Sequence, residues 1–260
     1  MSGVHPVAAA GFSSAADVYE RARPSYPEAA VEWLVEHTGL GTGATVVDVG
    51  AGTGKLTRLL VPCGARVIAV EPLAEMRALI EGVETVDATA EELPFADGFA
   101  DAITVAQAFH WFDHARALPE LHRVLRTGGF LVLIWNSRDL DDPIQRGVEE
   151  LLAPLRAEIP EQQLGAWREP LEQSPLFGPA ETAEFAYAQR FTTDDLCARV
   201  ASTSFVAAMP PIDREALLAR VRALAHDHQE PFAFPYKTEV HVLPRSRDRA
   251  ESEGGNSNEG

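Results

Sequence analysis

The sequence has no long hydrophobic run and little cysteine. Its longest uninterrupted apolar stretch covers only residues 130–135, whereas a membrane-spanning helix needs roughly 20 apolar residues. The first residues show no basic segment followed by an apolar one, as a secretory signal would require. The two cysteines, Cys63 and Cys197, lie far apart; they could pair, but reduced thiols in an intracellular protein are the simpler interpretation. We therefore expect a cytoplasmic protein with no membrane insertion.

Positive charge is also scarce. Lys and Arg together number 22 against 39 Asp and Glu, which gives a formal net charge of −17. The only lysines are Lys55 and Lys237, and the arginines are scattered apart from a short cluster at residues 245–249. Because so acidic a chain is repelled by nucleic acid and by anionic membrane surfaces, we expect neither as a partner.

The composition is that of a globular protein, with 46% hydrophobic and 23% charged residues over 260 positions. In its first half, short apolar runs typical of buried strands cover residues 45–49, 66–70, 83–86, 101–106 and 129–135. Helical patterns lie before and between them, at residues 25–39, 55–60, 73–80 and 118–125, with Ser25 as the predicted N-cap of the first. Strands joined by helical crossovers predict an α/β fold with an open, mostly parallel, Rossmann-like sheet covered by helices on both faces.

The pattern changes after residue 140. Helices are predicted from residue 143 and over residues 193–200 and 213–225, and strands over residues 184–191 and 236–243. We predict a flexible N-terminus at residues 1–16, a single domain at 17–244 and a disordered tail at 245–260. Within the domain, residues 17–140 would form the core and residues 141–235 a helical insertion.

A glycine-rich loop follows the first predicted strand. Residues 48–54 have the sequence DVGAGTG. Gly50, Gly52 and Gly54 suit a sharp turn whose backbone a ligand must approach without a Cβ in between. Such glycines also end strands for purely structural reasons, so the loop alone is weak support for a nucleotide site.

An acidic residue follows the second predicted strand. Glu71 lies 17 residues beyond Gly54, where a carboxylate can accept two hydrogen bonds from adjacent ribose hydroxyls. The alternative is that Glu71 only caps the helix after Pro72. We favour the ligand interpretation because loop, strand and acid all fall in register.

The spacing of the loop narrows the choice of ligand. A dinucleotide fingerprint would place its third glycine where this chain has Lys55, and the Walker pattern is absent from the sequence. Gly-x-Gly-x-Gly preceded by an acid, here Asp48, better fits an adenosyl ligand without phosphates.

With this loop the sequence resembles the class I S-adenosylmethionine-dependent methyltransferases, specifically their small-molecule branch of ubiquinone/menaquinone-biosynthesis-like and trans-aconitate-like enzymes. The resemblance covers roughly residues 17–137. Its motifs are the glycine loop (46–54), the ribose-binding segment (70–72), the adenine-binding loop (89–95), the fourth strand with its following loop (101–112) and the turn before the fifth strand (123–129). The resemblance implies S-adenosyl-L-methionine as the cofactor and a seven-stranded sheet that ends in an antiparallel C-terminal hairpin.

The resemblance also implies a set of cofactor-binding residues. They are Asp48, Gly50, Ala51, Gly52, Gly54, Glu71, Pro72, Thr89, Ala90, Glu91, Gln107, Tyr19 and Arg23. Asp48 would meet the methionine end of the cofactor, although it could instead only brace the glycine loop. Thr89 departs from the family pattern, because many relatives have an aspartate there that receives the adenine amino group. Adenine recognition would then rest on the Ala90 backbone, with Asp87 or Glu91 as a substitute.

The chemistry of methyl transfer demands little beyond alignment and exclusion of water, since a sulfonium already activates the methyl group. If the acceptor must lose a proton, His110 after the fourth strand is the candidate catalytic base; a positional role in its loop is an equal alternative. Phe109, Trp111 and Phe112 could form the wall of a substrate pocket, and simple core packing is the alternative for Phe109 and Phe112. The other histidines show no metal-ligand spacing, so we expect no metal.

Arg23 and Tyr19 lie in a segment that resembles the N-terminal lid of these enzymes. Both could reach the cofactor carboxylate or an acidic acceptor, since arginine binds carboxylates bidentately. The alternative for this segment is the start of a surface helix.

Three functions remain open on the sequence alone. The favoured one is methyl transfer to a small-molecule acceptor, with residues 141–235 forming much of the acceptor site. The second is an NAD(P)-dependent oxidoreductase on a similar sheet, and the third is a non-catalytic regulator that binds the cofactor. The sequence identifies neither the acceptor, nor whether O, N or C is methylated, nor the oligomeric state.

Overall fold

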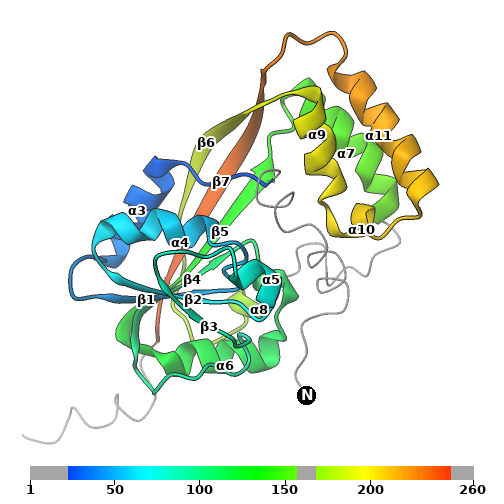
Figure 1. Ribbon diagram of the computed structural model, residues 1–260. Helices are drawn as coiled ribbons and strands as arrows, with labels where there is room; N and C mark the ends of the chain where they lie inside the picture. The colour runs from blue at the N-terminus through cyan, green and yellow to red at the C-terminus, as the bar shows by residue number, and fades with distance from the viewer. Residues whose placement is uncertain (1–22, 157–167, 247–260) are drawn as a thin grey trace, which may run out of the picture.

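A seven-stranded sheet forms the centre of the molecule (Figure 1). The computed structural model describes residues 23–156 and 168–246. The sheet has the order β3-β2-β1-β4-β5-β7-β6. Its strands are β1 (Thr45–Val49), β2 (Arg66–Val70), β3 (Glu84–Val86), β4 (Ala100–Ala106), β5 (Leu125–Arg138), β6 (Glu181–Phe191) and β7 (Phe232–Pro244).

The first five strands pair in parallel, and β7 pairs antiparallel with both β5 and β6. The predicted mostly parallel α/β sheet with an antiparallel C-terminal hairpin is therefore confirmed. Between β2 and β4, β1 is the point where the strand order reverses, and open α/β sheets bind ligands at the carboxyl edge of that point.

Helices cover both faces of the sheet, as predicted. On one face, α3 (Glu28–Thr38) and α4 (Lys55–Leu60) pack on side chains such as Val46 and Val132. On the other, α6 (His114–Val124) packs on side chains such as Val47 and Leu131. Successive strand residues thus enter opposite cores, which explains why these strands read as continuous apolar runs.

A separate helical cluster lies beyond the ends of β5, β6 and β7 (Figure 1). It consists of α7 (Pro143–Arg156), α9 (Thr193–Ala201), α10 (Ser204–Ala207) and α11 (Pro211–Ala225). Its core contains Val148, Leu196 and Val221 together with Phe191 and Phe234 from the strands. Because these long strands enter the helical core, they join the cluster firmly to the sheet.

Several predicted boundaries need correction. The helix predicted over residues 73–80 is only α5 (Ala74–Arg77), since the chain continues in tight turns after it. The N-cap of α3 is Pro27 rather than Ser25. Within the segment 141–235, the strand predicted over 184–191 is β6, which begins at Glu181. The segment also contains α8 (Arg168–Glu172), whose Leu171 joins the sheet core.

The first two residues of the predicted disordered tail, Arg245 and Ser246, are hydrogen-bonded to the domain. The backbone N–H of Arg245 donates to Gly129 O at 2.8 Å, and that of Ser246 donates to Leu176 O at 2.9 Å. These two residues are therefore held on the domain. The rest of the predicted tail, 247–260, and the predicted flexible N-terminus, 1–16, lie outside the described residues. No helix in the described parts of the chain is long and apolar enough to span a membrane.

Candidate functional site

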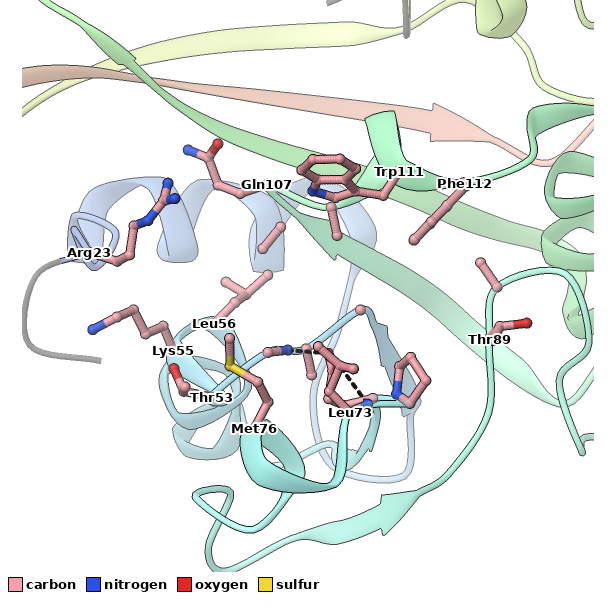
Figure 2. Close-up of a pocket in the computed structure, with 18 of the residues that line it drawn as sticks. Arg23, Thr53, Lys55, Leu56, Leu73, Met76, Thr89, Gln107, Trp111 and Phe112 are labelled. Atoms are coloured by element: carbon pink, nitrogen blue, oxygen red, sulfur yellow. Dashed lines mark hydrogen bonds between the residues drawn. The ribbon is translucent and has the colours of Figure 1, made fainter. Parts of the chain in front are cut away.

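A cavity opens at the carboxyl ends of β1, β2, β3 and β4. Four loops line it, at residues 50–53, 71–73, 88–91 and 106–112. In the last of these loops, residues 109 and 110 do not reach the cavity. Arg23, Lys55 and Arg199 add positive charge to its wall. Figure 2 shows Arg23 and Thr89 at opposite ends of the cavity, with Gln107 and Trp111 facing Thr53 and Met76 across it.

Two glycines of the loop, Gly50 and Gly52, differ in the space around them. Gly50 and Gly52 have φ of 68° and 58°, in the left-handed region that favours glycine. A Cβ on Gly50 would lie 2.7 Å from Ala108 Cβ, so only a glycine here allows the loop after β1 to pack closely on the loop after β4. A Cβ on Gly52 would have no described protein atom within 4 Å. Gly52 therefore borders open space in the cavity, where a ligand can approach the backbone.

Glu71 is bonded to the glycine loop. Its Oε2 accepts the Gly52 backbone N–H at 2.8 Å, and its Oε1 accepts that of Leu73 at 2.9 Å. Burial raises the pKa of the Glu71 carboxyl, while these two hydrogen bonds act in the opposite direction. A carboxylate has about four lone-pair sites, so Glu71 keeps acceptor capacity for a ligand in the cavity.

Asp48 lies beneath the loop rather than on the cavity wall. It is fully buried, and its two carboxylate oxygens accept the hydroxyls of Thr57 at 2.5 Å and Thr104 at 2.8 Å. Burial raises the pKa of Asp48 to about 6. Both oxygens face β4 and α4, which is the arrangement expected if Asp48 braces the glycine loop. Gly54 likewise does not line the cavity, and a Cβ there would lie 3.2 Å from Ile80.

Thr89 lies at the end of the cavity opposite Arg23, and its neighbours Ala90 and Glu91 also line the cavity. The Thr89 hydroxyl is buried without a hydrogen-bond partner among the described residues. Glu91 accepts the Asp113 backbone N–H at 2.9 Å. Asp87, predicted as a substitute adenine contact, is exposed and pairs with Arg77 at 3.0 Å, outside the cavity lining.

The loop after β4 is held in an uncommon conformation. Gln107 has φ of 56°, rare for a residue other than glycine. Its side-chain Nε2 donates to Asn136 O at 3.2 Å, and Asn136 Nδ2 donates to Ser25 O at 2.8 Å. Gln107, Trp111 and Phe112 thereby form one wall of the cavity, tied to the segment before α3.

His110, the predicted catalytic base, does not line the cavity. Its ring centroid lies 4.6 Å from that of Trp111 and 5.3 Å from that of Trp135. Burial, and secondarily the positive charge of Arg23, lower the pKa of His110 to about 4. His110 is therefore neutral at physiological pH and a weak base. Phe109, beside it, is fully buried in the sheet core.

Of the two predicted lid residues, Arg23 lines the cavity and Tyr19 lies outside the described residues. The Arg23 Nη2 donates to Ser202 O, at the end of α9, at 3.0 Å. Arg199, which no sequence pattern indicated, lines the same cavity from α9. No local motif marks it, because only the packing of the helical cluster brings it to the sheet edge. Within residues 23–156 and 168–246, no group of three or more His, Cys, Asp or Glu side chains could hold a metal ion.

A sheet of this order with a glycine loop and strand-end acid at its switch point defines a class I methyltransferase fold. Residues 47–133 match the family described as "Methyltransferase domain". An uncharacterized methyltransferase of Mycobacterium tuberculosis strain H37Rv is 39% identical over 236 residues, which cover 87% of this chain and 92% of the relative. The chain therefore belongs to the class I S-adenosylmethionine-dependent methyltransferase family.

Other relatives and structures agree with this assignment. An uncharacterized methyltransferase-like protein of Schizosaccharomyces pombe is 31% identical, with 80% of this chain and 82% of the relative covered. The Escherichia coli ubiquinone/menaquinone biosynthesis C-methyltransferase UbiE is 33% identical over 45% of this chain and 52% of its own. The solved structure of a proposed type II methyltransferase from Anaeromyxobacter dehalogenans has a TM-score of 0.67 at 24% identity, over 86% of this chain and 97% of that one. The protein is thus an S-adenosylmethionine-dependent methyltransferase, and the oxidoreductase and regulator alternatives are set aside.

Proposed function

We propose that this cavity binds S-adenosyl-L-methionine and that the enzyme methylates a small molecule in the cytoplasm. The hydrogen bond from Gly52 to Glu71 carries the proposal, since it joins a loop that borders open space to a carboxylate with spare acceptor sites. The two described cysteines, both free, support a reducing compartment. The charge of −17 argues against nucleic acid as the acceptor.

The residues present fit the donor from one end of the cavity to the other. The partnerless Thr89 hydroxyl and the Ala90 backbone would recognise adenine. Glu71 would accept the ribose hydroxyls, and the backbone at Gly50, Ala51 and Gly52 would run along the sugar and sulfur. Pro72, Glu91 and Gln107 would complete the walls, and Arg23 at the far end would pair with the donor carboxylate. Asp48 would support the loop through Thr57 and Thr104 without touching the ligand.

When bound, S-adenosylmethionine supplies a methyl group that is already activated by a sulfonium. The protein's part is then to align the acceptor with that methyl group and to exclude water. Trp111 and Phe112 line the cavity, with the Phe112 ring 3.5 Å from the Cβ position of Gly50. Such aromatic faces suit a cation or an apolar acceptor. His110 supports this wall from behind, as a positioning residue, because it is neutral, weakly basic and outside the lining.

The helical cluster would contribute the acceptor side of the site. Arg199 reaches the cavity from α9, and Arg23 binds the end of the same helix. Residues 17–140 would therefore hold the donor, and the helices between residues 141 and 235 would hold the acceptor, within one domain.

Release of S-adenosylhomocysteine tests this function. Purified enzyme is incubated with S-adenosylmethionine and a panel of small molecules grouped by charge, and S-adenosylhomocysteine is quantified by mass spectrometry. Donor-dependent and acceptor-dependent release is expected. Binding of S-adenosylhomocysteine with no release for any acceptor would contradict methyl transfer to a small molecule, and failure to bind it would contradict the donor site.

A further inference from the structure

Two of the three guanidinium nitrogens of the partly buried Arg199 have no hydrogen-bond partner among the described residues. These two nitrogens, Nε and Nη1, are both inaccessible to solvent. Arg199 also lines the cavity that holds the proposed donor site. Burying a charged group without a partner is unfavourable, so a ligand that supplies acceptors to this guanidinium would be bound strongly.

The charges around the cavity favour an anion as that ligand. Among the described lining residues, Arg23, Lys55 and Arg199 are positive and only Glu71 and Glu91 are negative. Both acids already accept backbone N–H groups, Glu71 from Gly52 and Leu73 and Glu91 from Asp113. The two unpartnered donors of Arg199 are therefore the groups on this wall that an anionic ligand would satisfy.

Arg199 lies toward the end of the cavity that is away from the proposed adenine site at Thr89. The Ser202 carbonyl, just beyond α9, accepts Nη2 of Arg23 at 3.0 Å, and Ser202 Oγ donates to Arg199 O at 2.8 Å. Arg23 and Thr89 lie at opposite ends of the cavity (Figure 2). The end of α9 is therefore fixed near the Arg23 end, where the amino acid part of the donor and the acceptor would meet.

We propose that Arg199 binds an oxyanion, a carboxylate or phosphate group, of the methyl acceptor and so determines which acceptors the enzyme takes. This inference rests on the proposed donor site. The guanidinium fork matches two oxygens of a carboxylate or phosphate, and charge-assisted pairs of this kind are strong and directional. The acceptor is thus a small anionic molecule held by its charged group while another atom, or the anion itself, faces the methyl group.

Small anions test the proposal without knowledge of the acceptor. Wild-type enzyme saturated with S-adenosylhomocysteine is titrated with formate and, separately, with inorganic phosphate, at constant ionic strength, and the midpoint of thermal unfolding is followed. A saturable rise is expected for at least one anion, and the anion that gives it identifies the carboxylate or phosphate class. In Arg199→Gln the apparent affinity for that anion should fall by about tenfold or more.

Arg220→Gln is the matched control, because Arg220 is an exposed residue of the same helical cluster, on α11. It should keep the wild-type anion response. Arg199→Lys retains the charge without the planar fork, so its apparent affinity for the anion should lie between those of wild type and Arg199→Gln. This variant also serves if Arg199→Gln fails to fold. An anion response that is absent in wild type, or equal in wild type and both Arg199 variants, overturns the proposal.

A second titration separates the acceptor from the donor carboxylate. Arg199→Gln should bind S-adenosylhomocysteine as wild type does. If its affinity falls while that for 5′-methylthioadenosine, which lacks the amino acid part, is unchanged, Arg199 binds the donor carboxylate and the inference is wrong. If wild type binds neither nucleoside, the proposed donor site itself fails, which is a distinct result.

Discussion

The backbone N–H of Gly52 donates to Oε2 of Glu71 at 2.8 Å. One hydrogen bond thus joins the loop after β1 to the residue after β2, two features that the sequence shows only as separate signals. It fixes a glycine whose Cβ position is open to the cavity beside an acid that is 6% exposed. The donor site therefore depends on both residues together.

Replacing Gly52 with valine should abolish binding of S-adenosylhomocysteine. The added side chain would enter the open space beside the loop, and a φ of 58° would strain it as well. Gly39→Val is the control, because Gly39 has a similar φ of 65° and open space around its Cβ position, but lies at the end of α3 and outside the cavity lining. Calorimetric titration should find binding in Gly39→Val and none in Gly52→Val. Undiminished binding in Gly52→Val would contradict the loop assignment.

Glu71→Gln should weaken S-adenosylhomocysteine binding by on the order of 1.5–3 kcal/mol, as for hydrogen bonds to a charged group. Adenosine, which keeps the ribose, should lose affinity as well. Free adenine should bind wild type and variant equally, because it lacks the hydroxyls that Glu71 would accept. Equal losses for adenine and adenosine would instead indicate general collapse of the loop, since glutamine cannot accept from both Gly52 and Leu73 as a carboxylate does.

Thr89→Val tests the adenine end of the cavity with almost no change of shape. Removing the partnerless hydroxyl should weaken the binding of S-adenosylhomocysteine by about 1 kcal/mol. The S-inosyl analogue lacks the 6-amino group and should bind the variant and wild type alike. A loss of the same size for both ligands would show that Thr89 does not recognise the amino group.

His110 should destabilise the protein on acidification. Its pKa in the folded protein is about 4, lowered from 6.5, so below pH 6.5 the unfolded chain binds a proton that the folded one does not. The resulting loss of stability grows as the pH falls from 6.5 to 4 and reaches roughly 3 kcal/mol. Chemical denaturation at several pH values should show a smaller loss over this window in His110→Gln. Identical acid profiles would mean that His110 titrates normally. Turnover of the variant above pH 6.5 should remain near wild type if His110 only supports the wall.

The parts that the sequence could predict are those encoded locally. The apolar run at 45–49 and the glycines after it specify a buried strand and a sharp turn by themselves, and Glu71 follows from its place after the next strand. Arg199 could not be predicted, because it reaches the cavity only through the packing of α9 in the helical cluster. The anchoring of Arg245 to Gly129 was missed for the same reason, since a polar segment gives no apolar signal when backbone hydrogen bonds hold it.

Asp48 and His110 show that the position of a residue in the sequence does not determine where its side chain points. Both stand at positions where a functional acid or base is expected, and both are displaced from the cavity lining by the burial of their side chains. Sequence spacing identifies the loop that a residue occupies, whereas the direction of its side chain depends on partners such as Thr104 or Trp135, far along the chain.

The most direct test of the donor site is thermal unfolding of the wild-type protein with S-adenosylhomocysteine, S-adenosylmethionine, NAD and NADP in parallel. A ligand at about 100 times its dissociation constant stabilises the folded state by roughly 2.7 kcal/mol, enough to raise the midpoint by several degrees. The two sulfur nucleotides should produce this shift, and the nicotinamide nucleotides should not. A shift with NAD or NADP alone, or none with either sulfur nucleotide, would contradict the proposed site.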